Sequence, residues 1–92
     1  LMPQYAEGWN KRATAYYMRG DFKRSLEDIE QTLLLEGRHF GALSGKAGIF
    51  MEIQDYRKAL EALQALKQIL PHQPKIDRQI EEMYSKLGLR RS

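Results

Sequence analysis

Cysteine is absent from the 92 residues of the chain. This absence excludes a disulfide framework, a thiolate nucleophile and a cysteine-ligated zinc site. Long apolar runs are absent as well, and none approaches the roughly 18 residues that a membrane-spanning helix needs. The chain also lacks any block of like charge, because 15 Lys and Arg residues are interleaved with 12 Asp and Glu residues. The formal net charge of +3 therefore does not favour nucleic acid as a partner.

The length and composition are typical of one small soluble globular domain, with 42% hydrophobic and 29% charged residues. A chain without cysteine is compatible with reducing and oxidising compartments alike, so the localisation stays unknown. The sequence begins at Leu1 rather than at a start methionine. We therefore expect it to be a piece of a longer protein, so that a targeting signal could be missing.

An internal repeat appears when the chain is compared with itself at a shift of 34 residues. The segment DFKRSLEDIEQ, from Asp21, then falls on DYRKALEALQA, from Asp55. Three turn positions recur at the same interval, namely Pro3, Gly37 and Pro71. This series predicts two copies of one structural unit.

Within each unit the apolar residues recur with the period of a helix. A first stripe begins at Trp9 and ends at Gly20-Asp21, which is typical of a helix stop followed by an N-cap. A second stripe follows, the next unit repeats both, and a last amphipathic segment closes the chain. The pattern predicts five helices, stacked as antiparallel pairs. The expected core residues are Trp9, Ala13, Tyr16, Phe22, Leu26, Ile29, Leu33, Leu43, Ala47, Phe50, Tyr56, Leu60, Leu63, Leu66, Ile69, Ile76, Ile80, Met83, Tyr84 and Leu87.

Two sets of residues at matching positions characterise the repeat. The first is Trp9, Ala13, Tyr16, Gly20, Ser25, Ile29 and Thr32, and the second is Leu43, Ala47, Phe50, Ala59, Leu63, Leu66 and Pro71. In this pattern the chain resembles the tetratricopeptide repeat family. It departs from the family at Arg12 and Lys46, where leucine is preferred, at Gly37 for proline and at Gln54 for the turn glycine. The strings YAEGWNKRA and RHFGALSG further resemble a group of short bacterial and plastid repeat proteins of unknown function.

The resemblance implies an all-α fold, namely an α-solenoid of antiparallel helix pairs wound as a right-handed superhelix and closed by a C-terminal capping helix. We expect a single domain over residues 1–92. Its parts are the end of an upstream repeat (1–5), repeat one (6–39), repeat two (40–73), a capping helix (74–88) and a tail (89–92). Small residues are expected where paired helices approach closely, at Ala13, Ser25, Ala47 and Ala59.

Residues with catalytic potential do not form a productive pattern. His39 and His72 are expected in turns between units, without the convergent partners that a metal site or a general base needs. The adjacent residues Glu27 and Asp28 diverge around their helix and are expected on a solvated face. The sequence therefore predicts a non-enzymatic protein, with no metal and no cofactor.

Three glycines, Gly41, Gly45 and Gly48, form a stripe in an otherwise helical segment, where each costs roughly 1 kcal/mol relative to alanine. In the implied architecture the first helix of each pair lines the concave side, so the stripe faces the middle of a groove. We predict that this groove binds a peptide or helix of a protein partner. The predicted groove residues are Asn10, Thr14, Tyr17, Met18, Gly41, Ser44, Gly45, Gly48, Met51, Lys75 and Arg78.

Two other interpretations of the glycines stay open. In one, they let helices inside the fold pack unusually tightly, although Ala47 already supplies a small residue on the packing face. In the other, they form a surface for self-association into a homodimer, and the chain is a structural segment of a longer repeat protein. The family's clamp for a terminal carboxylate is not expected, because Lys75 is the one clear basic match. Nucleic acid binding by the basic C-terminus is the least favoured function.

Overall fold

The computed structural model describes residues 5–89, which form five α-helices and no strand. The helices are α1 (Ala6–Met18), α2 (Phe22–Leu35), α3 (Phe40–Glu52), α4 (Tyr56–Ile69) and α5 (Pro74–Lys86). The prediction of an all-α fold with five helices is confirmed. Of the predicted upstream segment and tail, residues 1–4 and 90–92 lie outside the described residues.

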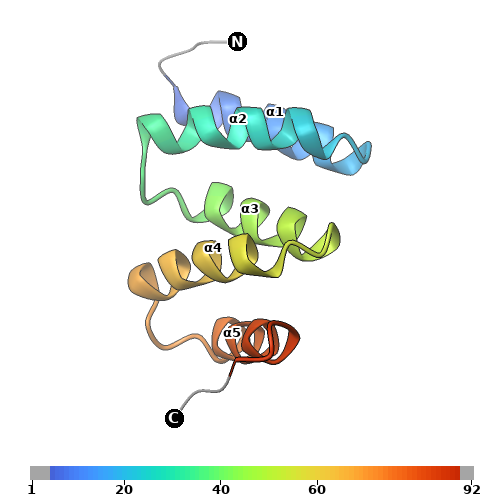
Figure 1. The fold of residues 1–92 in the computed structure, drawn as a ribbon. Helices are drawn as coiled ribbons and strands as arrows, with labels where there is room; N and C mark the ends of the chain where they lie inside the picture. Colours follow the sequence, from blue (N-terminus) through green and yellow to red (C-terminus); the bar gives the residue numbers. More distant parts are fainter. Residues whose placement is uncertain (1–4, 90–92) are drawn as a thin grey trace.

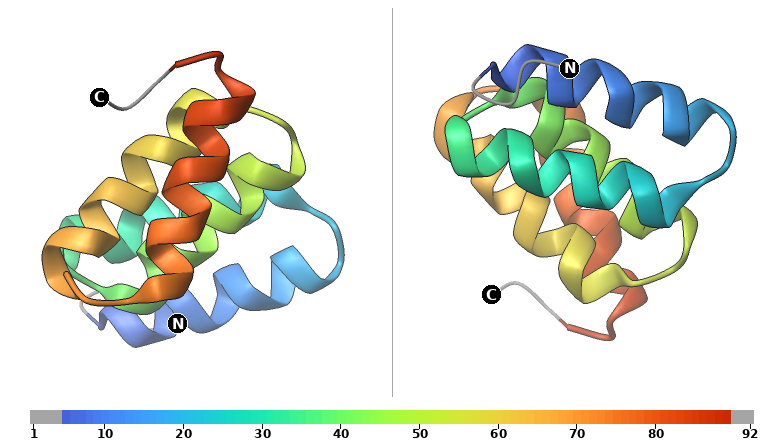
Figure 2. Two further views of the ribbon diagram at one scale, coloured as in Figure 1. Left: turned by 90° about the horizontal axis from the view of Figure 1, so that it is seen from below. Right: turned by 90° about the horizontal axis from the view of Figure 1, so that it is seen from above.

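The helices recur at the interval of the sequence repeat. α1, α3 and α5 begin at residues 6, 40 and 74, and α2 and α4 begin at residues 22 and 56, so both series advance in steps of 34. Figure 1 shows α1 with α2 and α3 with α4 as antiparallel pairs stacked in order, followed by α5. Figure 2 shows that the second pair is turned relative to the first. The architecture is that of a helical repeat solenoid.

Local side-chain chemistry explains where several helices begin and end. Asp21 and Asp55 each accept a hydrogen bond from the backbone N–H three residues later, at 3.2 and 3.3 Å, and His39 does the same through Nδ1 at 3.0 Å. After the first helix of each pair the chain turns through a left-handed residue, Gly20 with φ 78° and Gln54 with φ 64°. A glutamine there costs about 1 kcal/mol, so the second unit tolerates strain that the first avoids.

The hydrophobic core is larger in the second unit and the last helix than in the first unit. A small cluster of Ala13, Ile29, Ala42 and Ile49 joins α1, α2 and α3. A second, larger cluster contains most of the other predicted core residues that are buried. Further predicted core residues are partly buried and pack against one of these two clusters. The larger cluster joins α3, α4 and α5 and consists of Leu43, Ala47, Phe50, Ala59, Leu60, Ala62, Leu63, Leu66, Ile76, Ile80 and Met83.

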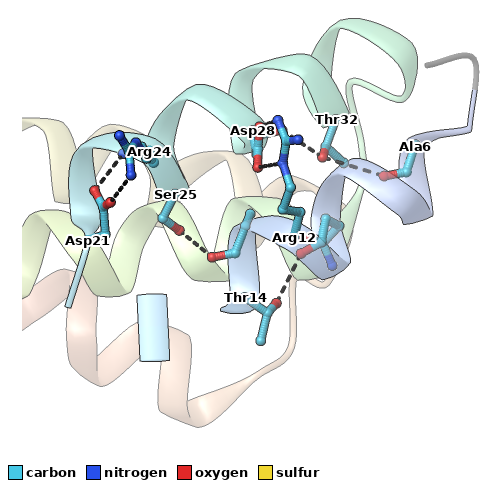
Figure 3. Close-up of polar contacts among 10 residues, drawn as sticks. Ala6, Arg12, Thr14, Asp21, Arg24, Ser25, Asp28 and Thr32 are labelled. Carbon is cyan, nitrogen blue, oxygen red and sulfur yellow. Dashed lines mark hydrogen bonds and ion pairs between the residues drawn. The ribbon is translucent and has the colours of Figure 1, made fainter. Parts of the chain in front are cut away.

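The close helix approaches occur at the small residues that the repeat pattern indicates. Ala13, Ser25, Ala47 and Ala59 are at most 2% exposed. Ser25 Oγ also donates a hydrogen bond to the carbonyl oxygen of Ala13 at 2.7 Å, as Figure 3 shows. The first pair is therefore joined by a polar contact at a position where the second pair has only alanine.

An ion pair between α1 and α2 corrects two expectations. Asp28, expected on a solvated face, is only 3% exposed. It accepts hydrogen bonds from Arg12 Nε at 2.7 Å and Nη2 at 3.0 Å (Figure 3), and these bonds raise the pKa of the Arg12 guanidinium. Trp9 and Tyr16, expected in the core, are only partly buried. The Arg12 guanidinium lies over both rings, 5.3 and 5.8 Å from their centroids.

Candidate functional site

Two hollows open between successive first helices of the stack. The first hollow lies between α1 and α3 and has a volume of about 210 Å³. The second hollow lies between α3 and α5 and has a volume of about 340 Å³. Ser44 and Gly48 of α3 line both hollows. The two hollows therefore form one groove that crosses α3, and we refer to them together as the groove.

The first hollow has an apolar floor and an uncharged polar rim. Ala13 and Ile29 are buried beneath it. At the rim, Thr14 Oγ1 donates a hydrogen bond to the carbonyl oxygen of Asn10 at 3.0 Å (Figure 3), so the hydroxyl oxygen can still accept a bond. None of the described residues that line this hollow is charged. Its lining consists of Asn10, Ala13, Thr14, Tyr17, Ser25, Ile29, Gly41, Ser44, Gly45 and Gly48.

The three glycines of α3 have different surroundings. A Cβ atom at Gly41 would lie 3.2 Å from both Asn10 Nδ2 and His39 Cε1, so this glycine permits a close approach of side chains. A Cβ atom at Gly45 would lie 3.4 Å from Ile29 Cδ1, which is ordinary packing. A Cβ atom at Gly48 would meet nothing within 4 Å. Close packing at Gly41 and open space at Gly48 thus occur about two turns apart on one helix.

The second hollow is the same site one repeat later, with different chemistry. Leu63 lies under it at the position that Ile29 has in the first hollow. Lys75 and Gln79 line it at the positions of Gly41 and Gly45, so it gains a cation and an amide where the first hollow has bare backbone. Its lining consists of Phe40, Ser44, Ala47, Gly48, Met51, Leu63, Leu66, Gln73, Lys75, Ile76 and Gln79.

Nine of the eleven residues predicted for the groove line one of the two hollows. Seven of them lie around the first hollow, namely Asn10, Thr14, Tyr17, Gly41, Ser44, Gly45 and Gly48. Met51 and Lys75 line the second hollow, together with Ser44 and Gly48. Two residues lie outside both hollows. Met18 is the last residue of α1 and is 81% exposed, and Arg78 is exposed on α5.

Sequence reasoning missed the floor of the groove and part of its far end. Ile29 and Leu63 come from the second helix of each pair, which the prediction did not consider for the groove. Phe40, which is 45% exposed, and Gln73 stand at the start of α3 and α5. The signal that could have found the floor is the repeat register, since Ile29 and Leu63 are 34 residues apart; no such signal points to Phe40 and Gln73.

Within residues 5–89 there is no group of three or more acidic, histidine or cysteine side chains that could hold a metal ion. His39 contributes both ring nitrogens to local structure. Its Nδ1 accepts from the backbone N–H of Ala42, so Nε2 carries the proton and is 3.1 Å from Glu7 Oε1 on α1. In the described part of the chain, no helix is both long enough and apolar enough to span a membrane.

Comparison with known proteins identifies two relatives, while no family model matches the chain. A TPR repeat-containing protein of Rhizobium etli is 39% identical over 88 residues, which is 96% of this chain and 43% of that protein. Human zinc finger CCCH domain-containing protein 7B is 33% identical over 79 residues, covering 86% of this chain and 8% of that protein. The chain thus spans less than half the length of either relative. The predicted resemblance to the tetratricopeptide repeat family is therefore confirmed, by the printed name of the first relative and by helices that repeat every 34 residues.

Proposed function

We propose that the chain is a non-enzymatic protein-interaction module that holds a segment of a partner protein in the groove. Similarity to a TPR repeat-containing protein supports an interaction module in general, and the groove supports a particular surface. The observation that carries the proposal is the pair of equivalent hollows joined through Ser44 and Gly48. A continuous concave surface of this kind suits an extended peptide or a single helix.

The first hollow suits an apolar side chain of the partner. Its floor is formed by Ala13 and Ile29, and its volume is about 210 Å³. An apolar cavity of about 150 Å³ is enough to bind benzene, so one branched or aromatic side chain fits. Asn10, Thr14 and Ser44 offer hydrogen bonds to the partner backbone on either side of that anchor.

The second hollow suits an oxygen acceptor of the partner. Lys75 is a donor of three hydrogen bonds and carries a full charge, and the amides of Gln73 and Gln79 lie beside it. We therefore expect the partner to present an apolar residue to the first hollow and an acidic residue, or exposed carbonyl groups, to the second. This pairing of an apolar anchor with an acidic neighbour defines the class of ligand.

The test is selection of binding peptides from a displayed library against the immobilised full chain, followed by affinity measurement with Gly48→Leu. A leucine at this position enters space that borders both hollows, and the backbone tolerates it because nothing lies within 4 Å of the added Cβ. We expect affinity to fall about tenfold or more, the equivalent of about 1.4 kcal/mol.

Gly37→Leu is the matched control. Gly37 lies between α2 and α3 and lines neither hollow, so its replacement should leave affinity unchanged. If the selected peptides bind Gly48→Leu as tightly as they bind the parent, the groove is not the binding surface.

Self-association is the second candidate function, and a separate observation favours it. Several large apolar side chains are exposed on the described surface, among them Leu34 at 78%, Ile53 at 49% and Phe40 at 45%. Such side chains can be covered by a second copy of the chain. Under this alternative, light scattering would show a mass that rises with protein concentration, and Leu34→Glu would abolish the rise.

A further inference from the structure

The fold collects basic side chains that are dispersed in the sequence at one edge of the stack. This edge consists of the α1–α2 turn, the α3–α4 turn and the end of α5, which follow one another on the same side in both views of Figure 2. The Lys86 Nζ of α5 lies 5.8 Å from the ring centroid of Tyr56, at the start of α4. We define the turn edge as residues 18–24, 52–58 and 86–89.

The turn edge is the positively charged part of the molecule. Against three acidic residues it holds six basic residues, namely Arg19, Lys23, Arg24, Arg57, Lys58 and Lys86. In the rest of the described chain, acidic residues outnumber basic ones by nine to seven. A partner that approaches the turn edge therefore meets a positive charge that the remainder of the molecule does not share.

Much of this charge is available to a partner. Arg19, Lys23 and Arg57 are exposed, and none of them forms an ion pair with another described residue. Two of the three carboxylates are engaged by the backbone, because Asp21 and Asp55 each accept a hydrogen bond from an N–H of the helix that they cap. The turn edge is therefore not neutralised from within.

The basic residues also stand where a helix disfavours them. The second and third residues are Lys23 and Arg24 in α2, and Arg57 and Lys58 in α4, and neither helix has an acidic residue in its first turn. The helix dipole favours negative charge at an N-terminus, so cations there lower stability. Both units have the same unfavourable arrangement, although the fold gains nothing from it. This cost favours a role for the charges outside the fold.

Exposed apolar side chains accompany the charges. Met18 ends α1, Ile53 is the C-cap residue of α3, and Leu89 follows α5. They are 81%, 49% and 43% exposed. Because they lie at the ends of helices and line neither hollow of the groove, they are accessible to a broad surface rather than to an inserted peptide.

We propose that the turn edge docks on the surface of an anionic lipid bilayer. The basic side chains bind the anionic headgroups, and Met18 and Ile53 enter the boundary between headgroups and acyl chains. A lipid surface satisfies both the charges and the apolar side chains, whereas the phosphate backbone of a nucleic acid satisfies the charges alone. No residue that lines the groove belongs to the turn edge, so this docking does not depend on the groove's function.

The experiment is sedimentation of the full chain with vesicles of phosphatidylcholine, with and without about a third of phosphatidylserine. We expect the chain to sediment with the anionic vesicles and to stay in solution with the neutral ones. Salt at several times the physiological concentration should release it, since salt screens exposed charges. A chain that ignores the anionic vesicles at low salt would overturn the proposal.

The double variant Lys23→Gln/Arg57→Gln tests the charges. We expect vesicle affinity to fall about 20-fold, because each basic residue near an anionic membrane contributes about fivefold. Unfolding in urea should show equal or higher stability, since two cations leave helix N-termini. Arg38→Gln/Arg78→Gln is the control of equal charge, at two exposed residues away from the turn edge. An equal loss of affinity in both double variants would show that net charge alone drives binding, and the turn edge would not be the docking surface.

Met18→Gln/Ile53→Gln separates a lipid surface from a nucleic acid. We expect a several-fold loss of vesicle affinity. Leu34→Gln/Leu35→Gln, which changes two exposed apolar residues at the other end of α2, should leave vesicle affinity unchanged. A DNA duplex is titrated in parallel at the same salt concentration. If the chain binds the duplex more tightly than the vesicles, and Met18→Gln/Ile53→Gln has no effect on either, the turn edge binds nucleic acid and the proposal is wrong.

Discussion

The three glycines of α3 show how different the roles of one residue type can be within a single helix. The sequence predicts their common face, because spacing of four and three places them together. It does not predict that Gly41 lies against Asn10 and His39 while Gly48 lies in open space. That difference depends on side chains from other elements. The question of groove or packing therefore has a separate answer at each position.

Gly48→Ala should raise the free energy of unfolding by about 1 kcal/mol, because alanine is the better helix former and nothing obstructs its methyl group. Gly41→Ala should gain less or destabilise, since its Cβ would lie 3.2 Å from two side-chain atoms. Urea unfolding of both variants against the parent measures the difference. A destabilising Gly48→Ala would mean that this position is packed, in this chain or against a second copy.

The ion pair of Arg12 and Asp28 could not be predicted from the sequence. The two residues are 16 positions apart and lie on different helices. Arg12 is visible in the sequence as a departure from the repeat pattern, and Asp28 resembles any other acidic residue on a helix. Only the packing of α1 on α2 shows that the departure has a partner. Because Trp9 is only partly buried, Trp9→Ala should lower the free energy of unfolding by less than removal of a fully buried ring would.

At the scale of elements, the sequence predicts the helices well because capping and periodicity are local properties. Asp21 and Asp55 begin α2 and α4 as the pattern indicates. Packing strength is not local, and here the two units differ. α1 buries only Ala6 and Ala13, whereas α4 buries Ala59, Leu60, Ala62, Leu63 and Leu66. The first helix therefore buries less apolar side chain than α4 does, and its contacts with α2 include the Arg12–Asp28 ion pair and the hydrogen bond of Ser25.

Backbone hydrogen exchange should therefore be slower in α4 than in α1. Burial of apolar side chains sets the free energy of local opening, and α4 lies between α3 and α5 while α1 stands at one end of the stack (Figure 1). Exchange measured by NMR or mass spectrometry provides the comparison at each amide. Equal protection of α1 and α4 would mean that the chain opens as one unit, without a weaker first helix.

At the scale of the whole molecule, residues at equivalent positions of successive repeat units lie next to one another and together form the groove. Nine of the eleven residues predicted for the groove line one of the two hollows, because equivalent positions on α1, α3 and α5 lie on the same side of the stack. Arg78 lies outside although its repeat equivalent Ser44 lies inside. The reason is that Ser44 has a first helix on both sides, and α5 is the last such helix in the described chain. Met18 is excluded by its place at the very end of α1.

The described chain extends over 45 × 25 × 17 Å, which makes coupling between its ends measurable. Met83 of α5 is 1% exposed and belongs to the larger core cluster, so Met83→Ala should lower the free energy of unfolding by about 3 kcal/mol. Trp9 is in α1, at the other end of the stack. If stacking makes the chain one cooperative unit, the unfolding transitions followed by Trp9 fluorescence and by circular dichroism should shift to the same lower midpoint.

Met18→Ala, at an 81% exposed site, is the control and should change the free energy of unfolding by less than about 0.5 kcal/mol. A Trp9 transition that stays at the parent midpoint would mean that α5 unfolds separately, and the groove would then lose its second hollow without losing its first.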